Sequence, residues 1–154
     1  MTLRTSLKYL LLLVILAGGM TYVILSRHKI NPCYGTSSQI NGNEKLILSS
    51  VIKFSGEHGY LKLTGDYFID GLAKAHVARE VSFRFTIENN EFKAVSESVV
   101  TRSDDTMDKK LLPGYFADFF LRKDRGLNLK LKHTETNGLV FFIDDSPVLY
   151  CNKE

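Results

Sequence analysis

The feature that most constrains this chain is a two-residue hydrophobic alternation that begins near Lys45 and continues to the C-terminus. In the segment VSFRFTIE, the apolar residues Val81, Phe83, Phe85 and Ile87 alternate with polar ones. Successive side chains of a β-strand point to opposite faces, so this pattern indicates strands with one buried face. The same rhythm recurs in YLKLTG and LNLKLKH, and EFKAVSESVV, LVFFID and SPVLYC are read as further strands. The pattern predicts about seven antiparallel strands.

Turn residues separate these segments. Asn89-Asn90 lies between two alternating runs, and asparagine tolerates the positive φ that a two-residue hairpin turn requires. Thr136-Asn137-Gly138 similarly precedes LVFFID. Strands that follow one another through short turns favour antiparallel neighbours. We therefore expect a bent antiparallel sheet or a partly open barrel.

One segment departs from the alternation. In LLPGYFADFFLRKDRG, the residues Leu112, Phe116, Phe119 and Phe120 recur at helical spacing. The spacing predicts one helix of about ten residues, which would persist only by packing its Phe face on the sheet. The preceding TRSDDTMDKK is charged and reads as a loop. The expected fold class is mainly β (α+β).

An uncharged run from Tyr9 to Ser26 precedes the alternating part. A helix of this length reaches about 27 Å, close to the thickness of a bilayer's hydrocarbon core. The alternative is a cleaved signal peptide, for which Ala17-Gly18-Gly19 offers small residues. The apolar run continues well past these glycines, which favours an uncleaved transmembrane anchor.

The flanking charges alone do not orient this anchor, since two Lys or Arg residues lie on each side. The free amino terminus favours a cytoplasmic N-terminus. We therefore divide the chain into a cytoplasmic tip (1–8), a transmembrane helix (9–26), a polar linker (27–44) and a β-rich domain (45–154). In a bacterium this arrangement means an inner-membrane protein with a periplasmic domain.

The charge distribution argues against nucleic-acid binding. The whole chain carries a formal charge of +3, but four of its twenty Lys and Arg residues precede residue 30 and no acid does. The rest therefore carries sixteen cations and seventeen anions, a net charge of −1. A basic footprint for direct contact with nucleic acid is absent from this part.

The two cysteines lie at opposite limits of the outer part. Cys33 follows the apolar run and Cys151 stands three residues before the end. Outside an anchor the compartment is oxidising, where two cysteines are expected to pair. The sequence has no C-x-x-C motif for metal or redox chemistry and no second cysteine pair for a zinc site, and a nucleophilic cysteine is the weaker alternative. A structural disulfide between Cys33 and Cys151 is the prediction.

Motifs that carry catalysis do not occur in the sequence. The histidines His28, His58, His76 and His133 are scattered, and HExxH, G-x-S-x-G and a phosphate loop are absent. The acidic doublets Asp104-Asp105 and Asp144-Asp145 read as solvated loop residues. We predict no enzymatic activity, no cofactor and no metal site.

The whole arrangement resembles the FidL-like family of small bacterial membrane proteins. The resemblance rests on a short tip, one anchor, a cysteine soon after it, the strand AREVSFRF and the terminal PVLYC. This family is similar in role to MyfF and PsaF, and more distantly to ToxS. The resemblance implies a periplasmic accessory subunit that stabilises or modulates a ToxR-like single-pass transcription regulator.

A different class of function is also compatible with the residues, namely a periplasmic domain that binds a small lipid or amphiphile.

For the accessory role, Ala17, Gly18 and Thr21 give a small-residue face for a second membrane helix. Pro147 suits an edge strand, so Ser146, Pro147, Val148, Leu149 and Tyr150 form a candidate docking edge.

Overall fold

The computed structural model describes residues 32–135 and 138–151. The expected transmembrane helix (9–26), with Ala17, Gly18 and Thr21, lies outside the described residues, as does His28. Within the described part, no helix has the length and apolarity to cross a membrane.

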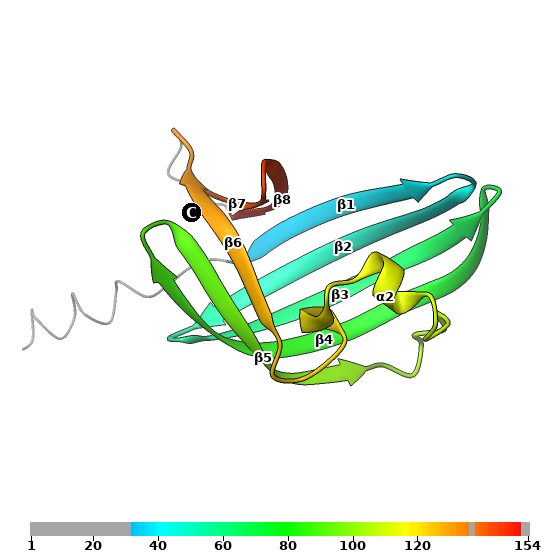
Figure 1. The fold of residues 1–154 in the computed structure, drawn as a ribbon, viewed down its shortest axis with the longest axis horizontal. Helices are drawn as coiled ribbons and strands as arrows, with labels where there is room; N and C mark the ends of the chain where they lie inside the picture. Colours follow the sequence, from blue (N-terminus) through cyan, green and yellow to red (C-terminus); the bar gives the residue numbers. More distant parts are fainter. Residues whose placement is uncertain (1–31, 136–137, 152–154) are drawn as a thin grey trace, which may run out of the picture.

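The described chain forms a closed barrel of eight antiparallel strands, in which each strand pairs with the next and the last returns to the first (Figure 1). The strands are β1 (Cys33–Asn41), β2 (Glu44–Ser55), β3 (His58–Ile69), β4 (Leu72–Glu88), β5 (Glu91–Thr101), β6 (Gly126–His133), β7 (Leu139–Ile143) and β8 (Ser146–Cys151). Between β5 and β6 lie a one-turn helix, α2 (Leu112–Tyr115), and a 3-10 turn, η1 (Asp118–Phe120). The mainly β prediction is confirmed, with eight strands and full closure in place of about seven strands and an open edge.

The alternation predicted for 81–88 is present in β4 from Val81 to Phe85, whereas Ile87, expected on the buried face, is 44% exposed near the end of the strand. Phe83 and Phe85 are buried, whereas Arg84 is exposed and pairs with Glu97 at 3.0 Å. The turn at Asn89-Asn90 is also confirmed, because both residues adopt positive φ, 52° and 64°. These local features were predictable because strand period and turn chemistry act over a few residues.

The additional strand is β1, and it corrects the prediction of a linker at 27–44. Residues 33–41 pair with β2 in continuous register from Cys33↔Ile52 to Asn41↔Glu44. The strand was not predicted because its composition is polar. Apart from Cys33, its inward face carries no large apolar side chain, and that face includes Ser37 and Gln39. The neighbouring β2 supplies buried Leu46, Leu48 and Ile52 to the core instead.

The expected ten-residue helix is also corrected. The chain leaves the helical conformation at Phe116 (φ −128°, ψ 137°) and resumes a tighter turn at Asp118. This break lets Phe116 and Phe119 enter two different apolar clusters. A helix this short gains little from its own hydrogen bonds, so packing decides its path.

The core consists of two clusters along the barrel. The proximal cluster surrounds the disulfide end and is rich in phenylalanine, with Phe54 contacting Phe83, Phe85, Phe92 and Phe141 at centroid distances of 5.0–6.4 Å. The distal cluster contains Leu46, Leu48, Leu63, Tyr67, Val77, Met107, Leu112 and Phe116. Phe120 packs against both clusters.

A disulfide joins Cys33 to Cys151, as the sequence predicted. These cysteines are also register partners, and the ladder between β1 and β8 comprises this pair and Tyr34↔Tyr150. The bond therefore lies where the first and last strands of the barrel meet.

The alternation yields a stability prediction. Phe85→Ala should lower the free energy of unfolding by about 3–5 kcal/mol, because it removes a large side chain from the proximal cluster. The matched neighbour Arg84→Ala should cost less than about 1 kcal/mol, since its ion pair is exposed. Urea titration followed by circular dichroism measures both values, and equal losses would contradict the assignment of faces.

The position of the disulfide yields a second prediction. It links residues 118 apart in sequence, and chain entropy assigns such a loop about 4–5 kcal/mol. The double variant Cys33→Ser/Cys151→Ser should therefore unfold at clearly lower urea concentration than the oxidised wild type. Addition of reductant should shift the wild type toward the variant and leave the variant unchanged. Equal unfolding midpoints for the double variant and the oxidised wild type would show that the bond contributes no stability.

Candidate ligand cavity

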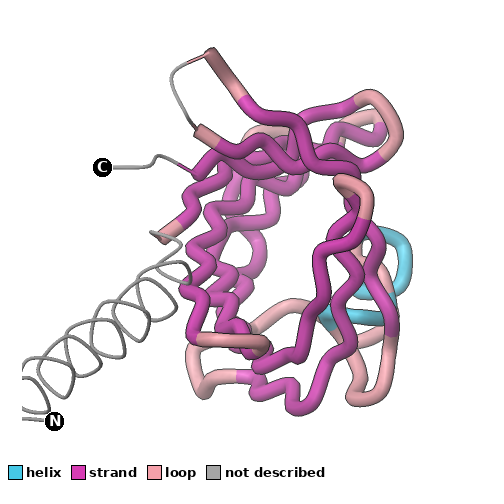
Figure 2. The backbone as a smooth tube through the Cα atoms, turned by 90° about the vertical axis from the view of Figure 1, so that its left-hand side faces the viewer, coloured by secondary structure: helices cyan, strands magenta, loops and turns pink. Residues whose placement is uncertain are grey.

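The cavity begins where β1 and β8 separate. After their two register pairs, β1 continues beside β2, while β8 continues beside β7. Residues 36–39 of β1 and 146–149 of β8 line the resulting cavity, whose volume is about 590 Å³. Figure 2 shows the backbone of the strands arranged as a ring. The volume lies within the range of about 300–1,000 Å³ found for small-molecule sites.

Gly35 allows β1 and β8 to pass close to each other before they diverge. A Cβ atom on Gly35 would lie 2.5 Å from the Val148 carbonyl oxygen and 2.7 Å from Leu149 Cδ2. A larger residue here would push β8 away from β1. Gly35 therefore sets the width of the junction beside the disulfide.

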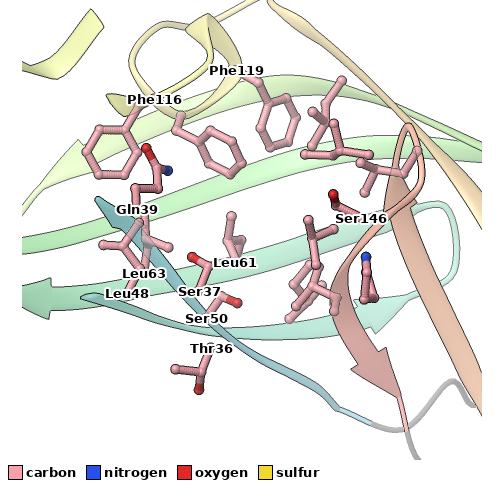
Figure 3. Close-up of a pocket in the computed structure, with 18 of the residues that line it drawn as sticks. Thr36, Ser37, Gln39, Leu48, Ser50, Leu61, Leu63, Phe116, Phe119 and Ser146 are labelled. Carbon is pink, nitrogen blue, oxygen red and sulfur yellow. The ribbon is translucent and has the colours of Figure 1, made fainter. Parts of the chain in front are cut away.

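The walls of the cavity are largely apolar. Leu48 and Ile52 of β2 and Leu61 and Leu63 of β3 come from the inward faces of their strands. Phe116 and Phe119 approach from the opposite side, as Figure 3 shows. Further apolar lining residues are Phe83, Phe92, Phe120, Leu127, Leu129, Ile143, Pro147, Val148 and Leu149.

Polar side chains are concentrated on the side formed by β1 and β2. Ser37 and Ser50 lie near each other in Figure 3, and Gln39 extends toward Phe116. The Ser50 hydroxyl donates to the Gly35 carbonyl oxygen at 3.2 Å. Gln39 Nε2 donates to the carbonyl oxygen of Tyr115 at 3.1 Å. Ser146 contributes a further hydroxyl from β8.

Residues 112–120, which we call the cap, bridge the barrel between β5 and β1. Tyr115 anchors the cap, because its hydroxyl donates to the Glu44 carboxylate and its ring meets Tyr67 edge-on at 5.6 Å. The hydrogen bond to Glu44 is the largest cause of the raised pKa of Tyr115, followed by burial. The phenol therefore stays protonated and continues to donate throughout the neutral range.

A buried ion pair fixes the chain before the cap. Arg79 Nε lies 3.0 Å from Asp105 Oδ2, with the two side chains 5% and 2% exposed. Asp105 also accepts from the backbone N–H groups of Ala78 and Met107. The interpretation of the doublet Asp104-Asp105 as solvated was therefore wrong for Asp105. Its partner lies 26 residues earlier, too far for sequence reasoning to connect the two.

The cap's return to β6 is fixed by Ser96 on β5. Its hydroxyl donates to the Arg122 carbonyl oxygen at 2.7 Å, and its backbone exchanges hydrogen bonds with Asp124 and Arg125. The cap is thus held at both ends and at Tyr115. This arrangement keeps Phe116 and Phe119 against the cavity.

The remaining sequence candidates lie apart from the cavity. His58 and His76 pair with Glu97 and Asp66 on the outer surface. His133 ends β6, and Asp144 occupies the turn between β7 and β8 with φ 51°. In residues 32–135 and 138–151, no group of three or more His, Cys, Asp or Glu side chains could hold a metal ion.

The candidate docking edge is strand β8. It pairs with β7 from Ser146 to Cys151, and with β1 only through Tyr150 and Cys151. Along 146–149, no strand of the described chain pairs with its other side. Docking of a partner there stays a prediction, and four of the five residues, Ser146–Leu149, also line the cavity.

Sequence reasoning missed Ser37, Gln39 and Ser50 as site residues. One signal was present, because Ser50 interrupts the inward series Leu46, Leu48, Ile52 and Phe54 of β2. A polar residue at an inward position marks either a buried hydrogen bond or a cavity. Only the tertiary structure distinguishes the two.

Comparison with known proteins places the chain in a family. A search of curated proteins found no match to the sequence. A protein-family model described as the YqeJ C-terminal domain matches residues 36–151, which covers nearly the whole barrel. This match does not show a link to the FidL-like family, which stays a proposal. The chain belongs to the YqeJ C-terminal domain family.

Proposed function

We propose that the barrel binds a small apolar or amphiphilic molecule in the cavity beneath the cap. The observation that carries this proposal is the cavity of about 590 Å³, with apolar walls and a few polar groups collected on one side. Binding sites for small molecules commonly have this composition. An apolar ligand would leave water and contact the Leu and Phe walls, which favours binding.

The construction of the barrel supports this use. A fully collapsed core would bring β8 against β1 along its whole length, whereas the two strands share only two register pairs. The cap holds Phe116 and Phe119 beside the space without filling it. The disulfide keeps the diverging strands together at one end.

The test is photolabelling of the 154-residue chain in lipid nanodiscs with a diazirine-bearing alkyl alcohol. Peptide mapping should show saturable labelling in β1, the cap and β8. Leu127→Trp places a larger side chain in the cavity and should lower this labelling several-fold. Leu72→Trp makes the same change at a residue that is 62% exposed and outside the cavity lining, and should leave labelling unchanged. Labelling that is absent, or that does not saturate, would overturn the proposal.

A second candidate is the accessory role that the FidL-like resemblance implies. In this proposal, the chain is anchored in a bacterial inner membrane and its periplasmic barrel stabilises or modulates a ToxR-like regulator. The disulfide fits an oxidising compartment. The unpaired side of residues 146–149 offers backbone groups that can extend a partner's sheet. A ligand that preferred one state of such a complex would shift its population.

The accessory role predicts a dependence of the regulator on this chain. Deletion of the gene should shorten the half-life of the candidate regulator in the same membrane and change transcription of its targets. Restoring the gene should reverse both effects. An unchanged half-life together with unchanged transcription across inducing conditions would exclude this role.

A further inference from the structure

We infer that the cavity selects uncharged molecules that carry a hydroxyl group over carboxylates of the same length. This inference rests on the proposed ligand binding and specifies its chemistry. It derives from the charge of the lining and from the hydrogen bonds that its polar residues already make.

The lining provides no formal charge. Among the described residues that form it, none is Asp, Glu, Lys, Arg or His. A carboxylate or ammonium group moved from water into such a site would lose its hydration without gaining a counter-charge, which is costly. The part of a ligand that enters the cavity should therefore be neutral.

Two polar groups of the lining, on Ser50 and Gln39, have acceptor capacity that a donating ligand can use. The Ser50 hydroxyl proton is directed to Gly35 O, and one amide proton of Gln39 to Tyr115 O. The Tyr115 hydroxyl proton is directed to Glu44. The free capacity at Ser50 Oγ and Gln39 Oε1 is therefore that of acceptors.

An alcohol matches this capacity, whereas a carboxylate does not. A ligand hydroxyl can donate to Ser50 Oγ or Gln39 Oε1 and accept from the Ser37 hydroxyl, which stands on the same wall (Figure 3). An ionised carboxylate could accept from Ser37 but could not donate to Ser50 Oγ or Gln39 Oε1. Ser50 is partly buried, so an Oγ left there without a donor opposes binding, whereas the exposed Gln39 can keep a water molecule.

Ser49 provides a matched control for Ser50, and Gln39 provides a position at which a charge can be added. Ser49 is the exposed neighbour of Ser50 and points away from the cavity. Its replacement by alanine removes a hydroxyl from the same strand without touching the lining. Gln39 is itself exposed at the rim, so a lysine there would add a cation at the mouth of the cavity, and its ammonium group could still donate to the Tyr115 carbonyl oxygen.

The experiment compares photolabelling of the 154-residue chain in nanodiscs by diazirine-bearing decanol, with decanol or decanoate as competitor. Decanol should compete with at least about tenfold higher apparent affinity than decanoate. Ser50→Ala should weaken competition by decanol several-fold, and Ser49→Ala should not. Gln39→Lys should strengthen competition by decanoate relative to wild type. Because the two proteins are compared with the same competitor in the same lipid, partitioning of decanoate into the nanodisc cancels from this comparison.

The outcomes separate the two proposals. Equal competition by decanol and decanoate, with saturable labelling, would overturn the selectivity and leave ligand binding in place; it would mean that a charged head group remains in water at the mouth. Equal effects of Ser50→Ala and Ser49→Ala would also overturn it. If Ser50→Ala does not fold, the response of Gln39→Lys decides: unchanged decanoate competition would contradict the selectivity. Absence of any saturable labelling would instead remove the ligand-binding proposal.

Discussion

The covalent bond between Cys33 and Cys151 joins the first and last strands at the point where they share backbone register. Every other neighbouring pair of strands has a longer ladder, and several continue for nine or more residues. Two register pairs alone provide few hydrogen bonds to hold a barrel closed. Closure of the ring therefore depends on the disulfide more than on the sheet itself, and the packing of the proximal cluster around both cysteines depends on that closure.

The same junction explains how the barrel can be both closed and hollow. Because β1 and β8 are fixed at one end, they can diverge at the other without opening the ring completely. Where β1 and β8 lie apart, two hydrogen bonds attach the cap to the strands. Gln39 donates to the Tyr115 carbonyl oxygen, and the Tyr115 hydroxyl donates to the Glu44 carboxylate. The buried pair of Arg79 and Asp105 keeps the preceding chain in place. These long-range attachments hold the cap and the diverging strands around the cavity.

Several of these features could be predicted from local sequence. The inward series from Val81 to Phe85 of β4 follows from the two-residue period, and the turn at Asn89-Asn90 follows from the φ preference of asparagine. The bond between the two cysteines was also predicted from their positions in the sequence. Strand β1 was not, because Ser37 and Gln39 look like linker residues unless the cavity that they face is known. The cap was only partly predicted. The helical spacing of its phenylalanines was visible, whereas the break at Phe116 results from two clusters that the sequence does not locate.

By itself, the sequence determined that this part of the chain would be an antiparallel β-structure, since alternation and turn residues act over a few positions. It also indicated that the two ends would be tied together, because its two cysteines stand at opposite limits of this part and cysteines pair in an oxidising compartment. Only the tertiary structure decided that the sheet closes, that β8 separates from β1, and that Ser37, Gln39 and Ser50 face one enclosed space. Those properties depend on strand register and on contacts between residues up to 118 positions apart, which no local pattern specifies.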